Sequence, residues 1–527
     1  MKPTARIFRI LDAHRRTIAS FLAVALAANA FVLAQEALTD RDASVLASGQ
    51  DVGVSRNEAP DPGLASLPSG SPASSASKRA AAKRDVRALR PGSFIAGKGT
   101  VPNGISGNEL TVVYYWKGDQ TKSSPFLNGT GQEGNVDEGQ AFRNLVAYIN
   151  KHADGGQLMG QRFDLHGWEL KPVVVEAGKG DDQIRAAELI ASEIKPFAAV
   201  SSHGSISAYV CPRLAKAKIF NVSTYDLDWG LFERTGGFCL PQGLSWEAQV
   251  DLSIAYLKKQ AASDKHATTT GLEPRRYGLL YAEYPGLVQS APRVQRMLAA
   301  EGLDVTIASV DPDLTTAGRQ QPGVIAKFRA AGVNTIVAPE SGSLITFTHA
   351  AQANGFTPDY FVWPCSGQDS LGMVRLYNAS QWARASGLTC YDAQLNADLS
   401  NDDTARKTQW YRAYREMAPG AEPPAQTSLV YQSLLPLVAG ITHAGRDLTI
   451  ERFREGLRAV APYRYDAIEG RTTDPTNILV TLDAPDGSQV GDAGTVRWDP
   501  SKRTQGNAAP GTYVFTERRR YKRGASF

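Results

Sequence analysis

Residues 197–226, FAAVSSHGSISAYVCPRLAKAKIFNVSTYD, decide the predicted fold. The stretch begins with an apolar strand-like run, Pro196–Ser202, continues with residues of helical periodicity, and returns to a second such run, Lys218–Ser223. A strand, a helix and a second strand in this order form a unit whose strands are parallel. Sheets of this kind bind ligands beyond the carboxyl ends of their strands, where this stretch carries small polar residues.

The same alternation precedes this stretch. Glu109–Trp116 (ELTVVYYW) and Leu170–Glu176 (LKPVVVE) are predicted strands, and Glu138–Lys151 and Asp181–Lys195 are predicted helices. Residues 109–225 therefore predict a parallel α/β sheet with helical crossover connections.

The pattern starts again after residue 270 and predicts a second lobe. Its predicted strands are Tyr277–Ala282, Asp304–Val310, Asn334–Pro339 and Asp359–Trp363, and its predicted helices are Gly286–Ala300, Pro322–Ala331 and Leu344–Asn354. Pro322 suits a first helical turn, and Gly302, Gly332 and Gly355 suit the positions just past helix ends. Two α/β lobes follow from this repetition.

After residue 400 the order changes. The predicted helices are Asp403–Met417, Gln426–Ala444 and Thr449–Val460, and the predicted strands are Asn477–Leu482, Thr495–Trp498 and Thr512–Thr516. A late return of the chain to both lobes accounts for this mixture. The basic run Arg518–Arg520 with Lys522 and Arg523 is interpreted as a solvated tail.

Length and charge restrict the class of protein. A chain of 527 residues with 42% hydrophobic and 21% charged residues is globular and too long for one ordinary core. Residues 1–108 hold 14 Lys and Arg against 8 Asp and Glu, which leaves 43 against 45 in the remainder. The lobes are nearly neutral, so no nucleic-acid-binding surface is predicted.

The N-terminal residues predict export. Four arginines precede an apolar stretch, Thr17–Ala34, and we assign residues 1–39 to a secretory signal or a membrane anchor. Both readings stand, because residues 28–30 and 32–34 are possible cleavage sites and the stretch barely reaches spanning length. Residues 40–108 are rich in Ala, Ser, Pro and Gly and are predicted to be a disordered tether.

The four cysteines of an exported protein predict disulfides rather than a metal site. Cys211 and Cys239 fall in the first lobe, and Cys365 and Cys390 fall in the second. Pairing within each lobe would leave the lobes free to move, although four cysteines allow three connectivities.

No catalytic apparatus is recognisable. Gly129, Gly131 and Gly134 have the spacing of a dinucleotide turn, but Gly129 lies 13 residues beyond Trp116, too far for a tight turn. The chain has no G-x-S-x-G elbow, no H-E-x-x-H helix and no Cys/His cluster, and its seven histidines are scattered. The sequence therefore predicts a binding protein without catalytic residues, cofactor or metal.

The order and spacing of these segments resemble the type I periplasmic binding proteins of the leucine/isoleucine/valine-binding group. The segments that carry the resemblance are residues 155–165 (GGQLMGQRFDL), 181–193 (DDQIRAAELIASE), 197–226, 277–286 (YGLLYAEYPG), 328–342 (FRAAGVNTIVAPESG) and 349–356 (HAAQANGF). The resemblance implies two Rossmann-like lobes joined by a three-strand hinge. Lobe one would comprise residues 109–243 and 391–476, and lobe two residues 244–390 and 477–527.

The resemblance also implies a ligand site between the lobes. The loop Ser202–Ser205 leads into a helix whose N–H groups suit a carboxylate, and this loop and Ser223–Tyr225 would hold that end of the ligand. Tyr284 of lobe two would close over it. The candidate ligand-binding residues are Trp116, Ser202, His203, Gly204, Ser205, Ser223, Thr224, Tyr225, Tyr284, Ser341 and Ser366.

The expected ligand is a small polar molecule such as an amino acid or an amide. Relatives that bind amino acids often place an acid near the loop that here reads WPCSG (residues 363–367), and this chain has none before Asp369. Glu283 or Glu340 would have to pair with an ammonium group, which places an α-amino acid in doubt.

We therefore expect an extracytoplasmic solute-binding protein, secreted or tethered to the membrane, that presents its closed form to the permease of an ABC transporter. The alternative is an extracellular sensor that signals through a membrane anchor. A nucleotide-using enzyme is a more distant alternative.

Overall fold

The first sheet of the computed structural model is built around β2 (Glu109–Trp116). This strand pairs in parallel with both β5 (Glu169–Glu176) and β6 (Ala198–Val200). The sheet continues in parallel through β7 (Phe220–Thr224) to β8 (Cys239–Pro241). The parallel sheet predicted for lobe one is thus confirmed, with β2 at its predicted bounds.

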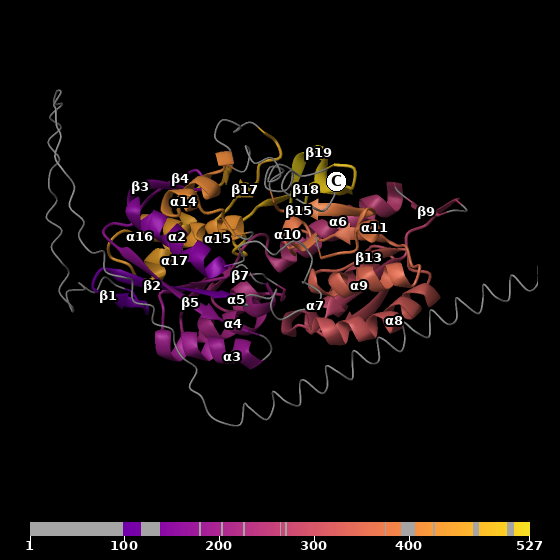
Figure 1. The fold of residues 1–527 in the computed structure, drawn as a ribbon, viewed down its shortest axis with the longest axis horizontal. Helices are drawn as coiled ribbons and strands as arrows, with labels where there is room; N and C mark the ends of the chain where they lie inside the picture. Colours follow the sequence, from indigo (N-terminus) through magenta and orange to yellow (C-terminus); the bar gives the residue numbers. More distant parts are fainter. Residues whose placement is uncertain are drawn as a thin grey trace, which may run out of the picture. The chain divides into compact units, whose positions relative to one another are not determined.

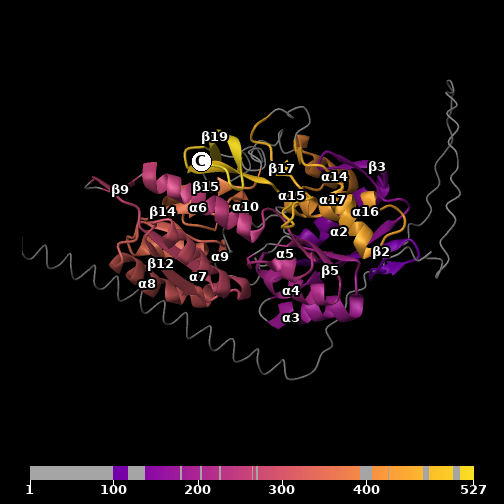
Figure 2. The ribbon, with the colours of Figure 1, turned by 180° about the vertical axis from the view of Figure 1, so that it is seen from behind.

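Successive residues of β2 are buried on opposite faces of the sheet, so helices must cover both faces. Val112 and Tyr114 pack in one cluster with α2 (Glu138–Lys151). Val113 and Tyr115 pack in a second cluster with residues of two further helices. These helices are α3 (Asp181–Glu188), which continues into a π-helical turn at Leu189–Ile194, and α4 (Gly204–Lys216). Both views show α3 and α4 side by side below β5 (Figures 1 and 2).

The chain returns to lobe one after the first five strands of the second sheet. The smaller elements of this lobe and the helices of the return are β1 (Ile105–Ser106), β3 (Asp154–Leu158), β4 (Gln161–Asp164), α5 (Leu231–Arg234), α14 (Gln409–Met417), α15 (Thr427–Ser433), α16 (Leu435–Ala444) and α17 (Ile450–Arg458). The return packs on α2 and β4, and the amide of Met159 donates to the Tyr431 hydroxyl at 3.1 Å. Segments far apart in sequence therefore share one core.

The second sheet contains the strands predicted for lobe two. Its strands, in spatial order, are β12 (Val305–Val310), β11 (Tyr277–Ala282), β13 (Thr335–Val337), β14 (Asp359–Val362), β15 (Ala385–Thr389), β18 (Asp492–Asp499) and β19 (Thr512–Lys522). The first five are parallel, and β18 and β19 add antiparallel strands at one edge. Its other elements are α6 (Trp246–Ser263), β9 (His266–Thr268), β10 (Gly271–Glu273), α7 (Pro285–Ala300), α8 (Leu314–Ala330), α9 (Gly342–Ala353), α10 (Leu371–Val374) and α11 (Ala379–Trp382).

Two local expectations for lobe two fare differently. Gly302, Gly332 and Gly355 follow helix ends with φ of +80°, +68° and +63°, as predicted for positions that favour glycine. Pro322, in contrast, lies inside α8 and not in its first turn. The helix begins eight residues earlier because the Asp313 carboxylate accepts hydrogen bonds from the amides that follow it and caps the helix there.

The basic run at residues 518–523 is solvated at four of its five basic residues, but it is not a free tail. Most of it forms β19, which pairs with β18, and the side chain of Arg520 is completely buried. The predicted strand Asn477–Leu482 also differs, because only β17 (Leu479–Val480) forms and it pairs with β16 (Tyr463–Arg464) and not with the second sheet.

Both disulfides connect cysteines of the same lobe, as the spacing suggested. Cys211 is bonded to Cys239, with 6.0 Å between their Cα atoms, and Cys365 is bonded to Cys390, with 5.4 Å.

The structure describes residues 99–116, 137–178, 181–201, 204–224, 227–263, 265–268, 271–374, 376–391, 406–424, 427–466, 474–502 and 511–527, which belong to one unit, Arg84–Phe527. Within these ranges no helix is both long and apolar enough to cross a membrane. The predicted signal or anchor, the glycine loop at residues 129–134 and most of the predicted tether lie outside them. Residues 99–108 of that tether are held in place, since the Thr100 amide donates to the Glu451 carboxylate at 2.8 Å.

Candidate ligand-binding site and hinge

The carboxyl edge of the first sheet brings together three of the predicted site segments. Trp116 ends β2, Ser201 follows β6, and Thr224 ends β7, and because these strands are parallel neighbours their ends lie at the same edge. The backbone of Gly204 and Ser205 begins α4, which two residues separate from Ser201. Ser202, His203 and Tyr225 lie outside the described residues, and of Gly204, Ser205, Ser223 and Thr224 only the backbone is described.

Trp116 offers a hydrogen-bond donor at this edge. Its side chain is buried, with a relative exposure of 5%. The indole Nε1 has no hydrogen-bond partner among the described residues. A buried N–H group without an acceptor costs free energy, which a ligand acceptor would recover.

The carboxyl edge of the second sheet positions the lobe-two candidates. Tyr284 is the residue before α7, and Ser341 is the residue before α9. A Cβ atom built on Gly342 would lie 3.6 Å from the Tyr284 hydroxyl, and one built on Gly367 would lie 3.5 Å from the Ser341 hydroxyl. Tyr284, Ser341 and the turn at Gly367 are therefore neighbours.

Glu340 lies beside them but its carboxylate is already engaged. The carboxylate accepts hydrogen bonds from the amides of Ala282 at 3.2 Å and Ser343 at 3.1 Å, and from that of Gly342. Burial raises the pKa of Glu340 above its ordinary value, and these hydrogen bonds act in the opposite direction. The carboxylate thus caps α9. Glu283, the other acid considered as a partner for an ammonium group, is exposed and accepts a hydrogen bond from Ser309 at 2.7 Å.

The hydroxyl of Ser366 takes part in the local turn. It donates to the carbonyl of Trp363 at 2.8 Å and accepts from the amide of Gln368 at 3.4 Å. The Trp363 indole is also internal, because it donates to the Gln249 side chain at 3.0 Å and packs on Trp246. Of the lobe-two candidates, Tyr284 and Ser341 are therefore less enclosed than Ser366, which is 7% exposed.

The two lobes touch where α7 faces the loop after β7. The Arg293 guanidinium lies 3.6 Å from the centroid of the Trp229 ring, a cation–π contact. A Cβ on Gly286 would lie 2.8 Å from the carbonyl oxygen of Leu227 and 2.8 Å from the Asp228 side chain. Only glycine allows this approach of the α7 backbone. The sequence analysis did not identify this contact, since its partners are distant in sequence.

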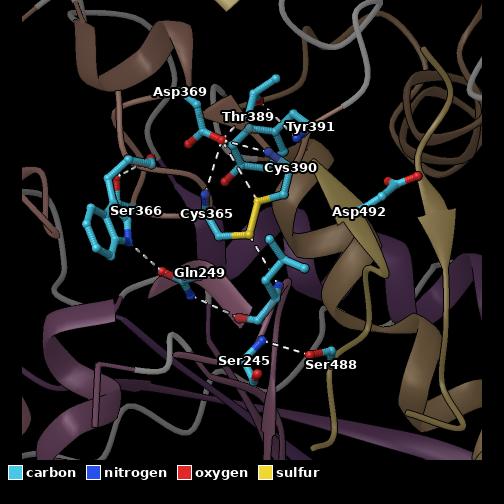
Figure 3. Close-up of a disulfide and its surroundings, with 12 residues drawn as sticks. Ser245, Gln249, Cys365, Ser366, Asp369, Thr389, Cys390, Tyr391, Ser488 and Asp492 are labelled. Atoms are coloured by element: carbon cyan, nitrogen blue, oxygen red, sulfur yellow. Dashed lines mark hydrogen bonds between the residues drawn. A yellow bond between two sulfur atoms is a disulfide. The ribbon is translucent and has the colours of Figure 1, made fainter. Parts of the chain in front are cut away.

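Three segments cross between the lobes and form the predicted hinge. We call them the first crossover (residues 243–245), the second crossover (residues 389–391) and the third crossover (residues 476–492). The first carries the chain from β8 to α6 and packs on the disulfide of Cys365 (Figure 3). The Leu244 amide lies 3.2 Å from the Cys365 sulfur, and the Ser245 amide donates to the Ser488 hydroxyl at 2.8 Å.

A buried carboxylate holds the second crossover. One oxygen of Asp369 accepts from the amides of Cys365 at 3.2 Å and Cys390 at 3.1 Å, and from the Thr389 hydroxyl at 3.0 Å. The other oxygen has no partner among the described residues. Burial raises the pKa of Asp369 to about 6, against the opposite effect of these hydrogen bonds.

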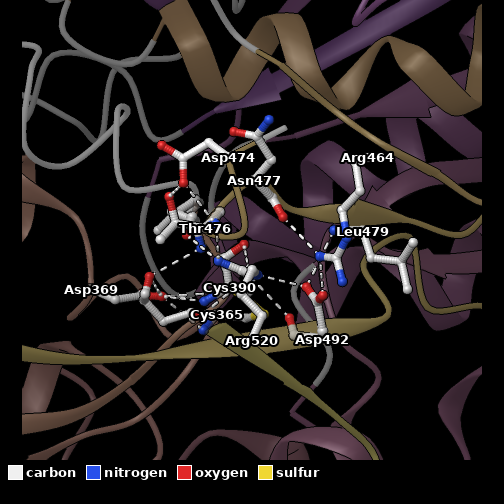
Figure 4. Close-up of polar contacts among 12 residues, drawn as sticks. Cys365, Asp369, Cys390, Arg464, Asp474, Thr476, Asn477, Leu479, Asp492 and Arg520 are labelled. Atoms are coloured by element: carbon white, nitrogen blue, oxygen red, sulfur yellow. Dashed lines mark hydrogen bonds and ion pairs between the residues drawn. A yellow bond between two sulfur atoms is a disulfide. The ribbon is translucent and has the colours of Figure 1, made fainter. Parts of the chain in front are cut away.

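A buried ion pair holds the third crossover (Figure 4). Arg520 Nε lies 2.7 Å from Asp492 Oδ1, and neither side chain is exposed. Arg464 also pairs with Asp492. The Arg520 guanidinium donates further to the carbonyl of Tyr391 at 2.8 Å. Sequence reasoning missed this cluster because Arg520 belongs to a basic run, which usually indicates a solvated surface.

The described residues contain no group of three or more His, Cys, Asp or Glu side chains arranged to hold a metal ion. At the carboxyl edges of the two sheets these residues present an unpartnered indole donor, a helix start, and aromatic and hydroxyl groups.

Comparison with known proteins agrees with the fold of two α/β sheets. The family model described as periplasmic binding protein matches residues 127–503. A fatty acid ABC transporter substrate-binding protein from Thermomonospora curvata is similar in structure, with a TM-score of 0.50 and 14% identity over 80% of this chain and 95% of that chain. None of the curated protein sequences compared with the chain matches it.

Two further solved structures are bacterial solute-binding proteins of ABC transporters. One, from R. palustris in complex with 4-hydroxybenzoate, has a TM-score of 0.51 and 11% identity and covers 80% of this chain and 98% of its own. The other, from Rhodopseudomonas palustris BisB5 in complex with 3,4-dihydroxybenzoic acid, has a TM-score of 0.51 and 11% identity and covers 80% and 99%. At such identities these likenesses concern the fold.

Proposed function

Since the chain belongs to the periplasmic binding protein family, we propose that it captures a small polar ligand between its two lobes and delivers it to an ABC-type importer. The observation that carries the proposal is the pair of parallel-sheet edges: Trp116 presents an unpartnered donor at one, and Tyr284 adjoins the start of α9 at the other. The family consists of substrate-binding proteins that act outside the cytoplasm, and both disulfides suit an oxidising compartment.

We propose organic acids without an ammonium group as the first ligand class. The start of α4 suits a carboxylate, because its amides point out of the helix and its dipole is positive there. The Glu340 carboxylate caps α9, which leaves it fewer acceptor positions for an ammonium group. Of the structurally similar proteins, one is described as the binding protein of a fatty acid transporter and two as complexes with hydroxybenzoates. Fatty acids and hydroxybenzoates are all carboxylates at neutral pH.

In this proposal the ligand lies between the two lobes. Lobe one contributes Trp116 and the loops at Ser202–Ser205 and Ser223–Tyr225, and lobe two contributes Tyr284, Ser341 and Ser366. The position of Tyr284 supports its proposed role in covering the ligand, because it lies at the start of α7, the helix that contacts lobe one. Export would be directed by residues 1–39, as a cleaved signal or as an anchor that keeps the protein at the membrane.

A thermal-shift screen tests the ligand class. The purified protein would be heated with 4-hydroxybenzoate, hexanoate, leucine, acetamide and glucose, and we expect the carboxylates without an ammonium group to give the largest rise in midpoint. A rise for leucine alone would reject the proposed class but not the family function.

A matched pair of tryptophan variants tests the site. Trp116→Phe removes the indole N–H and keeps an aromatic ring, and we expect about 5- to 20-fold weaker binding of the compound that the screen selects. Trp410→Phe is the control, because Trp410 is also buried in lobe one and its indole nitrogen is also unpartnered. Equal affinities of the two variants would place the ligand away from Trp116.

A further inference from the structure

The second crossover lies between two buried charges of opposite sign. Its N–H side faces Asp369, which accepts from the Cys390 amide at 3.1 Å. Its carbonyl side faces Arg520, whose guanidinium donates hydrogen bonds to the carbonyls of Cys390 at 3.1 Å and Tyr391 at 2.8 Å. An anion on the donor side and a cation on the acceptor side fix the position of this backbone more firmly than neutral hydrogen bonds would.

The disulfide of this segment also touches the first crossover. The Leu244 amide lies 3.2 Å from the Cys365 sulfur. A Cβ on Gly243 would lie 2.6 Å from the Cys365 sulfur and 3.4 Å from that of Cys390, so only glycine allows the backbone to pass this close to the bridge. The bridge therefore lies directly between the first and second crossovers (Figure 3).

Arg520 extends the connection to the third crossover. Its guanidinium donates to the Thr476 carbonyl at 3.4 Å and to Asp492, whose Oδ1 also accepts from the Leu479 amide at 3.2 Å. A continuous set of contacts thus leads from Leu244 through the bridge and Arg520 to Leu479. Figure 4 shows its part from Cys390 through Arg520 and Asp492 to Leu479.

The other disulfide has no such position. Cys211 of α4 and Cys239 of β8 form a small buried cluster with Leu231, all within lobe one. The two bridges are alike in loop length, with sequence separations of 28 and 25, so the chain contains its own matched control.

We propose that the Cys365–Cys390 bridge is a positioning element of the hinge, which couples the first crossover to the second, and that Arg520 extends this coupling to the third. Domain closure rotates the backbone at a few hinge residues, and three independent strands would also allow twist and shear. Coupled crossovers restrict the motion to one axis, so that contacts such as Arg293 with Trp229 form in the same register at each closure. Both cysteines are at least 95% buried, which suits a permanent link.

The proposal rests on the hinge closure of the proposed function, and its test uses the ligand-free full chain so that the two can fail separately. Cys365→Ser/Cys390→Ser would be compared with Cys211→Ser/Cys239→Ser by hydrogen exchange and mass spectrometry. The deciding peptide covers residues 474–480, which contain neither pair of cysteines. We expect its amides to exchange about 3- to 10-fold faster in the hinge variant and at the wild-type rate in the lobe-one variant.

Unchanged exchange at residues 474–480 in the hinge variant would overturn the proposal, and so would equal acceleration in both variants. If Cys365→Ser/Cys390→Ser does not fold, the Gly243→Ala variant provides the test. This change disturbs the contact of the first crossover with the bridge while both cysteines remain. Faster exchange at residues 474–480 in that variant supports coupling, and an effect confined to residues 242–246 overturns it.

Discussion

Arg520 and Asp492 form an ion pair in which neither side chain is exposed, with 2.7 Å between Arg520 Nε and Asp492 Oδ1. Buried ion pairs lose hydration energy when they form. This cost is offset where further hydrogen bonds satisfy the remaining N–H groups and oxygen atoms of the two partners. Here the guanidinium also binds main-chain carbonyls of the second and third crossovers. The pair therefore joins backbone segments that would otherwise bury unpaired carbonyl groups at the hinge.

Replacing Arg520 by Met should lower the free energy of unfolding by about 3–5 kcal/mol, because several carbonyls lose their donor and the buried Asp492 carboxylate loses one of its two arginine partners. Arg518→Met is the control on the same strand, since Arg518 is exposed, and should change the free energy by no more than about 0.5 kcal/mol. Urea unfolding followed by circular dichroism measures both. Equal stability of the two variants would contradict the structural role of Arg520.

Asp369 should make stability depend on pH in a defined window. Burial raises its pKa from 3.8 to about 6 in the folded protein, so folding favours the protonated carboxyl. The stabilising contribution is complete below about pH 4 and is lost as the pH rises through 6. Asp369→Asn removes this titration, so the unfolding free energy of the wild type should fall by about 2 kcal/mol relative to the variant between pH 4 and pH 7.

Unfolding both proteins in urea at pH 4, 5, 6 and 7 would test this expectation. Other titrating groups cancel in the difference between the two curves. A difference that stays constant across the range would mean that Asp369 titrates near its ordinary pKa in the fold.

Gly286→Ala should weaken ligand capture without weakening the fold. When the two lobes are in contact, the added Cβ would lie 2.8 Å from the carbonyl oxygen of Leu227. This distance is too short for a carbon and an oxygen atom, so the added methyl group opposes closure. We expect about tenfold weaker affinity for the compound selected by the thermal-shift screen, with the unfolding midpoint unchanged. Gly323→Ala in α8 serves as the control, because nothing lies within 4 Å of its added Cβ. Calorimetric titration that gives one affinity for both variants would argue against closure at this contact.

Limited proteolysis should yield a resistant core that begins near residue 99. The Thr100 amide and hydroxyl donate to the Glu451 carboxylate at 2.8 and 3.0 Å, which lowers the pKa of that acid and holds the segment on α17. In Glu451→Ala the core should begin near residue 105, whereas Glu455→Ala, an exposed change on the same helix, should leave it at 99. Mass spectrometry of the resistant fragment identifies its first residue. An unshifted start in Glu451→Ala would show that other contacts hold the segment.

The parallel sheets were predictable because their signals are local. The apolar run of β2 and the glycines after α7, α8 and α9 report on neighbours within a few residues. The start of α8 was missed because Pro322 was given more weight than the capping Asp313. A helix tolerates an internal proline when its tertiary packing offsets one missing hydrogen bond.

The candidate site was predictable only to the level of strand ends. The sequence located Trp116, Tyr284 and Ser341 at the sheet edges, since a parallel strand fixes where its last residue lies. It did not indicate that the Glu340 carboxylate caps α9 or that the Ser366 hydroxyl bonds within its own turn. Asp369 and Arg520 were missed because their partners lie up to 131 residues away, beyond any periodic signal.

Arg520 follows all three crossovers in the sequence, which sets an order on assembly. A protein that crosses a membrane from its N-terminus delivers all three crossovers before Arg520 arrives. Until then the carbonyls of Cys390 and Tyr391 lack the guanidinium that they bind in the finished fold. A chain still in transit can thus form the first sheet and the strands of the second sheet other than β19 before its hinge is complete. The contacts of Arg520 with the second and third crossovers therefore form only after β19 has been delivered.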